Sequence, residues 1–454
     1  MSGNRAGLGE IGLTQGLAAF ASGPAARMVP DTVRHAAGRA VIDTLGVMLA
    51  GRIEPPLGLL DATLEQGGEA RSLALGRILR TGDAALADGL AGHVLDYDDV
   101  ARHGHPSVVI VPALLAEAQR LGASGLALLD ACAVGQECWA ELAWREADAY
   151  HLGAWHPTPM LGTVAATAAL CALGQLDLET SRNALALAAS FASGVIANFG
   201  THAKPLQVGR AAANALEAVR HARTGLTGSP DALDGLLRGI SPKARVDVTS
   251  PVRAGRGAWQ WLDEGLSVKR YPVCYASHRA IDAVLAMRRE ANLVSGDVQS
   301  ITAFIGPAPA ATLRYSHPVD GLEARFSLHH NLAAALTDGV VGFAQLSDQF
   351  VRRADVAALY GLTRIEVVAG DCPDQPGMAV CDRVVIETSD GRSLDSGPVR
   401  HPRGHARLPL SDEELGAKFR DCALHGGYAD PDGLLDRLHS LRDIPDLREE
   451  IAQW

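Results

Sequence analysis

Apolar residues recur at helical spacing through the first half of the chain. In the segment "DTVRHAAGRAVIDTLGVMLAG", residues 31–51, they return every three or four positions, and the segment ends at a glycine. This period predicts an amphipathic helix, and Asp31 is its expected N-cap. Alanine- and leucine-rich segments of the same kind follow up to about residue 265, and none of them alternates convincingly like a strand. We therefore expect an α-helical domain over this part of the chain.

The pattern changes near Val268, where apolar and polar residues begin to alternate in the way that is typical of β-strands. The segments that predict strands are "VQSITAFIG" (298–306), "TRIEVVAG" (363–370) and "AVCDRVVIETSDGRSLDSGPV" (379–399). The last contains a turn at Ser389-Asp390-Gly391 and predicts a β-hairpin. Two helical segments, "HRAIDAVLAMRRE" and "LHHNLAAALTDGVV", lie between the strands. Together they predict a smaller α+β domain.

The end of the chain returns to a helical pattern. A capping box, Ser-Asp-Glu-Glu, begins at Ser411 and predicts a terminal helix. The expected fold is therefore mainly α, with a large all-helical domain formed by residues 1–267 and 401–454 and a smaller α+β domain formed by residues 268–400. A chain of 454 residues is long enough to support two hydrophobic cores.

Composition and charge exclude several classes of protein. Hydrophobic residues make up 47% of the chain and charged residues 20%, which is typical of a globular protein. The formal net charge of −11 and the lack of a Lys- or Arg-rich run argue against nucleic-acid binding. The sequence has no run of about 18 uncharged apolar residues, so we expect no contact with a membrane through a spanning helix.

The first residues and the cysteines bear on the compartment of the protein. The segment "MSGNRAGLGEIGLTQGLAAFASG" lacks the basic and apolar regions of a signal peptide. The seven cysteines are scattered without a Cys-x-x-Cys pair, which favours reduced thiols and offers no ligand set for an iron–sulfur cluster. We therefore expect a cytoplasmic protein.

Two His-Pro pairs share a layout. They stand in "GHPS" (104–107) and "WHPT" (155–158), and each precedes an apolar helical segment. A residue before proline is kept out of helical geometry, whereas proline suits the first turn of a helix. His105 and His156 are therefore expected at the mouths of two helices, whose N-termini attract carboxylates. A histidine in such a place can exchange a proton with an anionic substrate, and its alternative role is that of a cap alone.

Acidic and imidazole side chains gather in "HVLDYDDVARHGHPS", which holds three aspartates and three histidines within fifteen residues. A carboxylate beside a histidine fixes its tautomer and raises its basicity. Asp96 can do this for His105, or it can act as a base itself. Asp98 and Asp99 have the simpler interpretation of residues that cap or solvate a loop.

A metal site is the weaker interpretation of the same segment. His103 and His105 with an aspartate offer ligand types that zinc accepts. These histidines flank Gly104 in an expected loop, however, and no His-x-x-x-His on a helix supports them. The metal interpretation is therefore less favoured than proton transfer.

Basic residues further along the chain are candidates for holding carboxylates. Lys204 lies in "NFGTHAKPLQVGRAAANA", in a glycine-flanked turn, where an ammonium group can stabilise the charge of a carbon that loses its proton. A solvated loop lysine is the alternative. At the domain junction, where ligand sites are frequent, the candidates are Lys269, Arg270 and His278 in "KRYPVCYASH" and Arg325, His329 and His330 in "ARFSLHHN".

Five segments, taken in order, resemble those of the MmgE/PrpD family. They are "HVLDYDDV…HGHPS", "AWHPT", "NFGTHAKPL…GRAA", "KRYPVCYASHRAIDA" and "EARFSLHHNLAAALTDG", and the resemblance runs from about residue 30 to residue 420. The family includes 2-methylcitrate dehydratase, cis-aconitate decarboxylase and iminodisuccinate epimerase. The resemblance implies a helical domain closed by an α+β lid domain, a homodimer, no required metal, and proton removal beside a carboxylate of a small polycarboxylic acid.

The same resemblance carries active-site positions over to this chain. The matching residues are Asp96, His105, His156 and Lys204. Three positions depart from the family: Val100 stands where decarboxylase-like members have threonine, Gln207 where histidine is usual, and His330 where a lid tyrosine is the proposed proton donor. These departures argue against cis-aconitate decarboxylation.

We therefore predict a metal-independent lyase without a cofactor, which acts on a small di- or tricarboxylic acid by removing a proton next to a carboxylate. A hydro-lyase of the 2-methylcitrate dehydratase kind is the simplest form. His156 and the pair of His105 and Asp96 are expected to handle protons, and His330 is expected to donate one. The residues expected to hold substrate charge are Lys204, Lys269, Arg270, His278 and Arg325.

Two alternatives remain open at this point. The first is an epimerase of an imino- or amino-dicarboxylate, similar to iminodisuccinate epimerase, because two histidines on opposite faces of a carbon can also invert it. The second is a non-catalytic binding member of the family. The expected partners are a small polycarboxylate and a second copy of the chain in a homodimer, with no nucleic acid and no membrane.

Overall fold

The computed structural model describes residues 12–148, 150–373 and 378–454, and it divides into two compact units. The helical unit comprises the described residues up to Val94 together with Asp98–Leu266 and Asp412–Trp454. The second unit comprises Leu95–Tyr97 and Ser267–Ser411. It therefore takes in residues 401–411 and a three-residue segment near position 96 that the predicted boundaries assign to the helical domain.

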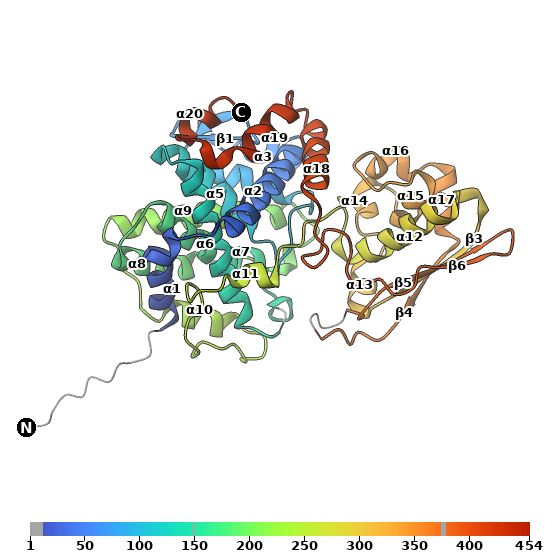
Figure 1. Cartoon of the computed structure of the whole chain (residues 1–454), viewed down its shortest axis with the longest axis horizontal. Helices are drawn as coiled ribbons and strands as arrows, with labels where there is room; N and C mark the ends of the chain where they lie inside the picture. The colour runs from blue at the N-terminus through green and yellow to red at the C-terminus, as the bar shows by residue number, and fades with distance from the viewer. Residues whose placement is uncertain (1–11, 149, 374–377) are drawn as a thin grey trace, which may run out of the picture. The chain divides into compact units, whose positions relative to one another are not determined.

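The helical unit is built almost entirely from helices, as Figure 1 shows. Its helices are α1 (Leu13–Ser22), α2 (Asp31–Gly51), α3 (Pro55–Asp61), α4 (Thr81–His93), α5 (Ser107–Leu121), α6 (Gly125–Trp144), α7 (Pro157–Leu173), α8 (Leu178–Phe191), α9 (Ala203–Arg223), α10 (Ala232–Ile240), α11 (Gln260–Glu264), α18 (Asp412–His425), α19 (Pro431–His439) and α20 (Leu447–Ile451). The predicted mainly α fold is confirmed. One detail is corrected: Pro30 is the N-cap of α2, and Asp31 is the first residue of the helix.

A small antiparallel sheet in the helical unit was not expected from the sequence. Strands β1 (Ala70–Ser72) and β2 (Arg77–Leu79) pair over three residues each. The buried carboxylate of Asp88, on α4, accepts hydrogen bonds from the Ser72 hydroxyl at 2.6 Å and from the Ala74 amide at 3.0 Å. Burial raises the pKa of Asp88 to about 6. The hairpin is thus anchored to α4 by a distant residue, which local alternation cannot reveal.

Helices α4 and α9 approach each other closely because glycines lie at their contact. A Cβ atom on Gly209 would come within 2.1 Å of the Leu86 carbonyl oxygen, and one on Gly89 would lie 2.8 Å from the Gly209 Cα. Backbone atoms cannot move aside as a flexible side chain can. This contact sets the position of two helices that carry residues of the site described below.

Gly209→Ala is expected to destabilise the protein by about 1–3 kcal/mol, because it overpacks this contact. The matched control is Gly82→Ala in the first turn of α4, where an added Cβ meets nothing within 4 Å. Urea denaturation of the two variants measures the difference. A Gly209→Ala variant as stable as Gly82→Ala would contradict the close contact.

The second unit is an α+β structure around a four-stranded sheet. Its strands are β3 (Val298–Ile305), β4 (Thr363–Val367), β5 (Arg383–Thr388) and β6 (Ser393–Asp395), in the order β4-β3-β5-β6. Strand β3 is parallel to β4 and antiparallel to β5, which forms the predicted hairpin with β6. Its helices are α12 (His278–Ala291), α13 (Pro307–Thr312), α14 (Gly321–Ala324), α15 (Leu328–Thr337), α16 (Asp348–Val351) and α17 (Ala354–Tyr360). Helices α12 and α15 cover one face of the sheet and enclose its core (Figure 1).

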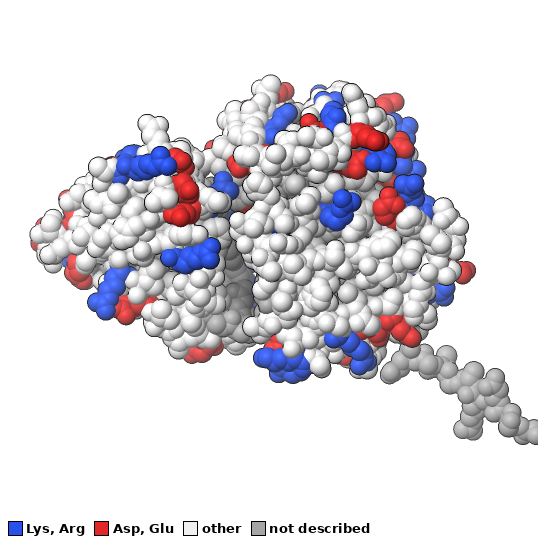
Figure 2. All heavy atoms as spheres, turned by 180° about the vertical axis from the view of Figure 1, so that it is seen from behind, with Lys and Arg blue, Asp and Glu red and all other residues white. Residues whose placement is uncertain are grey.

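Figure 2 shows the charged side chains on one face of the molecule. On the face shown in Figure 2, basic and acidic side chains are interspersed over the helical unit. Such mixing differs from the one-sided basic surface of a nucleic-acid-binding protein. Among the described residues, every helix is too short or too polar to cross a membrane.

Candidate acid–base site in the helical unit

The two predicted histidines lie where two helices begin. His156 is the N-cap residue of α7, and His105 precedes Pro106, the N-cap residue of α5. The His156 side chain makes no capping hydrogen bond to α7. The hydroxyl of Thr158, in the first turn of α7, accepts a hydrogen bond from the His105 backbone amide at 3.2 Å. The two helix openings are therefore tied together, and a role as a cap alone does not describe the His156 side chain.

A buried aspartate lies behind His105. One carboxylate oxygen of Asp98, Oδ2, lies 2.8 Å from Nδ1 of His93 and 3.3 Å from Nδ1 of His105. His93 is the last residue of α4, and both His93 and Asp98 are buried. The sequence analysis proposed Asp96 for this position and gave Asp98 the role of a loop residue. The structure instead brings Asp98 to His105.

The tautomer of His105 follows from its neighbours. Its Nδ1 lies 2.7 Å from the backbone carbonyl oxygen of Asp99, which can only accept a hydrogen bond. Nδ1 therefore carries a hydrogen, and in the neutral ring Nε2 holds the lone pair. This is the nitrogen that can take up a proton.

His156 is fixed in the same tautomer by a different partner. Its Nδ1 lies 2.9 Å from Oε1 of Gln207, on α9. The amide is oriented because Nε2 of Gln207 donates to the Val195 carbonyl at 3.2 Å, which turns Oε1 toward the ring. Nδ1 of His156 therefore donates, and Nε2 holds the lone pair in the neutral ring. Gln207, where histidine is usual in the family, is therefore the residue that fixes the His156 ring in this chain.

His93 lies beside both rings and joins them into one cluster. The centroid of its ring lies 5.0 Å from that of His105 and 5.8 Å from that of His156. Phe199 packs edge-on against His156 at 4.8 Å, and the Lys204 ammonium group lies 5.4 Å from the Phe199 ring centroid. Three imidazoles, a carboxylate and an ammonium group are therefore gathered in one part of the helical unit.

The cluster is largely withdrawn from water. The side chain of His105 is 16% exposed and that of Asp98 is 1% exposed, while His156 is buried and Lys204 is half-buried. Charges act more strongly on one another where water is excluded. The arrangement suits proton transfer, because an imidazole can give or take a proton near neutral pH.

The geometry also permits a test of metal binding. Ligand atoms of His93, Asp98 and His105 all lie within 4.8 Å of one another. A metal ligand must offer a lone pair, whereas the hydrogen bond to Asp99 requires a proton on Nδ1 of His105. Nδ1 of His105 therefore does not suit a metal ion, and the hydrogen-bonded interpretation fits better.

The structure does not bring His103 into this cluster. Its Nε2 lies 3.1 Å and 3.0 Å from the carbonyl oxygens of Ala143 and Glu146. Burial lowers the pKa of His103 to about 4, so it stays neutral near physiological pH. The pairing of His103 with His105 as metal ligands, already the weaker hypothesis, is not supported.

A second buried acid, Asp99, lies beside the cluster. Burial raises the pKa of Asp99 to about 8, and the charge of Asp43 adds to the shift. The unfolded chain releases this proton near pH 3.9, so between that pH and about pH 8 the folded state binds more protons. Folding stability contributed by this group is therefore lost as pH rises through that window.

Asp99→Asn is expected to remove this pH dependence. Between pH 5 and pH 8 the wild-type protein should lose at most about 1.4 kcal/mol per pH unit through Asp99, and the variant should show a flatter curve. Urea denaturation at several pH values measures the difference. Parallel curves for the two proteins would mean that Asp99 is ionised in the folded state.

In the second unit, Asp96 and Lys269 form a pair. The ammonium group of Lys269 lies 3.0 Å from the Asp96 carboxylate and also donates to the Asp96 backbone carbonyl. Lys269 is only 1% exposed. The backbone of Asp96 has a left-handed φ of 52°. The two residues, predicted separately as a base and a carboxylate ligand, therefore neutralise each other.

Two other predicted residues are packed into the core of the second unit. His330 is fully buried, with Nδ1 2.9 Å from the Tyr360 hydroxyl and Nε2 2.8 Å from the Gln345 carbonyl. Burial lowers its pKa to about 4. His278 is also fully buried, and its Nε2 lies 3.3 Å from the Val273 carbonyl. Their predicted roles as proton donor and carboxylate ligand stay predictions.

The predicted residues Arg270, Arg325 and His329 are better placed for contact with solvent. The side chain of Arg270 is 43% exposed and lies 3.9 Å from the Asp282 carboxylate. Arg325 is half-buried at the end of α14, and His329 is half-buried on α15. Burial lowers the pKa of His329, and the neighbouring His317 adds to the shift. Their part in substrate binding stays a prediction.

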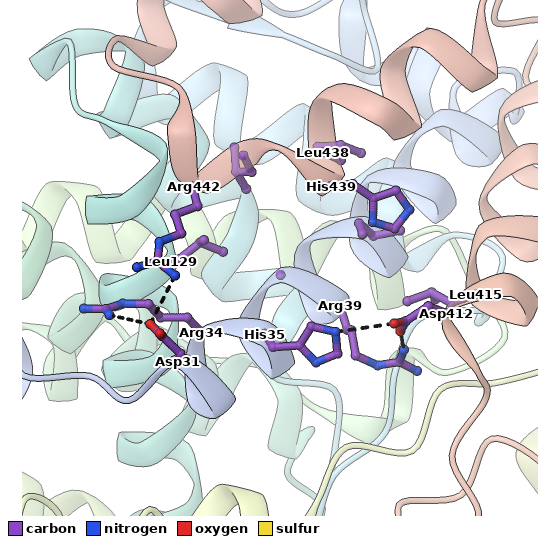
Figure 3. A pocket seen from close by; sticks show the side chains of 13 residues that line it. Asp31, Arg34, His35, Arg39, Leu129, Asp412, Leu415, Leu438, His439 and Arg442 are labelled. Carbon is purple, nitrogen blue, oxygen red and sulfur yellow. Dashed lines mark hydrogen bonds and ion pairs between the residues drawn. The ribbon is translucent and has the colours of Figure 1, made fainter.

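A cavity of about 210 Å³ lies elsewhere in the helical unit (Figure 3). Asp31 is held by Arg34 at 3.0 Å and by Arg442 at 3.2 Å. Asp412, the first residue of α18, is held by Arg39 and by His35. Because its acidic groups already bind its basic groups, we interpret this cavity as a junction that fastens the C-terminal helices to α2. The predicted site residues lie in other parts of the described chain.

Sequence reasoning missed four contributors to the cluster: His93, Asp98, Phe199 and Gln207. All four lie inside segments that were singled out, but without these roles. Gln207 stands three residues after Lys204, so one turn of a helix that begins near Lys204 places both side chains on one face. That spacing is the signal that could have found it.

The fold and this cluster define a mainly helical protein with three neighbouring histidine rings in its helical unit. The chain belongs to the MmgE/PrpD family, since the model of the MmgE/PrpD N-terminal domain matches residues 15–247 and that of the C-terminal domain matches residues 271–431.

The sequence of the chain is similar to those of three relatives. The chain is 30% identical over 385 residues to cis-aconitate decarboxylase of Mus musculus, covering 80% of this chain and 76% of the relative. It is 28% identical over 384 residues to cis-aconitate decarboxylase of Homo sapiens, covering 80% and 77%. It is 27% identical over 369 residues to a cis-aconitate decarboxylase-like protein of Aspergillus oryzae, covering 75% of each chain.

Proposed function

We propose that the protein is a lyase that acts on a small di- or tricarboxylic acid by moving a proton at the carbon next to a carboxylate. The observation that carries this proposal is the pair of imidazoles, His105 and His156, which begin neighbouring helices and share the tautomer that leaves the lone pair on Nε2. Membership of the MmgE/PrpD family and the relatives named as cis-aconitate decarboxylases support a carboxylic acid substrate.

The reaction that we favour is elimination of water. One imidazole takes the proton from the carbon beside the carboxylate, and the electron pair of that C–H bond forms the alkene. The C–O bond of the neighbouring hydroxyl breaks, and the other imidazole, as imidazolium, supplies the proton with which the hydroxyl leaves as water. Such general acids and bases contribute about 10²–10⁴-fold each. Lys204 supplies positive charge for the electron-rich carbon.

A second candidate function is epimerisation of an imino- or amino-dicarboxylate. The same two-imidazole geometry supports it, because one ring can remove a proton and the other can return it to the opposite face. Decarboxylation, named for the relatives, breaks a C–C bond to release carbon dioxide, and the carbanion that remains needs one proton donor. The substitutions Val100 and Gln207 argue against that reaction here.

Turnover in D₂O separates these reactions. The protein is incubated with 2-methylcitrate, citrate, cis-aconitate and iminodisuccinate, and the mixture is followed by ultraviolet absorbance, carbon dioxide release and proton NMR. We expect alkene absorbance from a hydroxy acid without carbon dioxide. Deuterium in otherwise unchanged substrate would favour the epimerase, and carbon dioxide would favour a decarboxylase. Thermal stabilisation by an acid without any of these changes would replace the proposal with a binding protein.

The homodimer expected from the family stays a prediction. Light scattering of the purified protein measures its mass in solution and decides between one copy and two.

A further inference from the structure

We propose that Asp98 makes His105 the proton acceptor of the imidazole pair, and that His93 acts on the site through Asp98. The inference rests on the proposed function and deepens it, because it assigns the direction of proton transfer. Asp98 and His93 are positioning residues: they act on His105 rather than on substrate.

The shared oxygen of Asp98 is the first observation. Its Oδ2 lies within 2.8 Å of Nδ1 of His93 and 3.3 Å of Nδ1 of His105. A buried carboxylate stays charged only if donors or cations stabilise it. Nδ1 of His93 donates to Oδ2 of Asp98. The Nδ1 hydrogen of His105 goes to the Asp99 carbonyl, so Asp98 acts on the His105 ring through its charge at 3.3 Å, and that negative charge favours a positive charge on His105.

The contrast with His156 is the second observation. Its Nδ1 hydrogen goes to the neutral amide oxygen of Gln207, which adds no negative charge. A carboxylate oxygen 3.3 Å from Nδ1 of His105 makes that ring accept a proton more readily, whereas the neutral amide beside His156 leaves that ring to release one more readily. We therefore assign His105 as the base and His156 as the acid.

Other charged groups around Asp98 are consistent with this assignment. Asp43, on α2, interacts unfavourably with Asp98, and burial together with this repulsion raises the pKa of Asp43, while Lys418, on α18, opposes that shift. Asp99, next in the chain, carries its proton up to about pH 8. Asp43 has Lys418 opposite it and Asp99 carries its proton, whereas Asp98 has a carboxylate oxygen 3.3 Å from Nδ1 of His105.

Asp98→Asn tests the assignment through the pH profile. We expect kcat to fall by about 10–100-fold with KM little changed. The acidic limb of kcat/KM, which reports deprotonation of the base in the free enzyme, should move to lower pH by about one unit or more. The matched variant Gln207→Glu places a carboxylate behind His156, and it should instead move the basic limb to higher pH.

His93 is tested by a pair of variants that separate the hydrogen bond from bulk. Asparagine keeps a donor near the place of Nδ1, whereas leucine has none. His93→Asn should retain the wild-type acidic limb, and His93→Leu should shift it as Asp98→Asn does. A purely structural role would lower the stability of both variants and leave the limb in place.

NMR titration of the histidine rings makes the inference independent of turnover. In wild-type protein and in Asp98→Asn, or in His93→Leu if Asp98→Asn does not fold, the midpoint of the His105 titration should fall by about one pH unit or more. An unchanged midpoint overturns the inference even if the enzyme is active. An absence of turnover in the wild-type protein, with a shifted midpoint, overturns the proposed function alone.

Discussion

Replacing His156 with asparagine is expected to lower kcat by about 10²–10⁴-fold, the usual contribution of a general acid or base. The asparagine amide can still donate to Oε1 of Gln207, the partner of Nδ1 at 2.9 Å in the native protein. It has no atom that replaces Nε2 as a proton carrier. The variant should therefore fold normally and bind substrate, while the chemical step fails. Steady-state kinetics on the best substrate of the D₂O panel measures the effect.

The control for this variant is the same exchange at His439→Asn. His439 is an exposed residue of the cavity in Figure 3, outside the acid–base cluster. We expect it to keep the wild-type kcat. A His156→Asn protein with more than half of the wild-type kcat would remove His156 from the reaction, and with it the two-imidazole proposal.

Lys418→Met is expected to destabilise the protein by about 3–5 kcal/mol, the usual cost of leaving a buried charge without its partner. The Lys418 ammonium group lies 2.6 Å from the Asp43 carboxylate, and the two side chains are 5% and 0% exposed. The pair joins α18 to α2. Burial raises the pKa of Asp43. The Asp43 carboxyl therefore keeps its proton to a higher pH in the folded state than in the unfolded state. The free energy of unfolding should therefore decrease as pH rises, and it should decrease more steeply in Lys418→Met than in the wild-type protein.

The double variant Asp43→Asn/Lys418→Met separates lost charge from lost packing. Without an unpaired carboxylate, it should recover much of the stability that Lys418→Met loses. Urea denaturation at pH 5 and pH 8 measures all three proteins. If Lys418→Met unfolds at the wild-type urea concentration, Asp43 does not depend on Lys418 for its burial.

Much of the fold could be predicted because its elements are encoded locally. Helix α2 and strands β3, β4, β5 and β6 follow periods that a short window contains. The hairpin β1–β2 could not be predicted in this way, since its strands have only three residues each and Asp88 anchors it from a helix further along the chain.

The positions of the two histidines could be predicted, because the backbone restriction imposed by proline sets them. The carboxylate beside His105 could not be predicted, because the path of a loop sets its position. His-Pro pairs place His105 and His156 at helix openings because proline restricts the residue before it. The choice between Asp96 and Asp98 depends on how the chain turns after α4, and the left-handed φ of Asp96 is part of that turn. Spacing alone cannot show which carboxylate faces the ring.

Spacing along the sequence also cannot show that His278 and His330 are buried. The segments that contain His278 and His330 begin helices that pack against the sheet of the second unit. The sequence does not show whether a histidine in such a helix faces a ligand or the hydrophobic core. In this chain both rings find hydrogen-bond partners inside the core, as buried polar groups require.

The most direct test of the two-imidazole site is a crystal structure of the catalytically impaired His105→Asn variant with a bound substrate acid. Asparagine keeps a donor for the Asp99 carbonyl, so the site should retain its shape. We expect the acid beside Lys204, with the reacting carbon or its hydroxyl within about 3–3.5 Å of Nε2 of His156. An acid bound only in the cavity of Figure 3, or ordered away from the rings of His156 and residue 105, would contradict the proposed site.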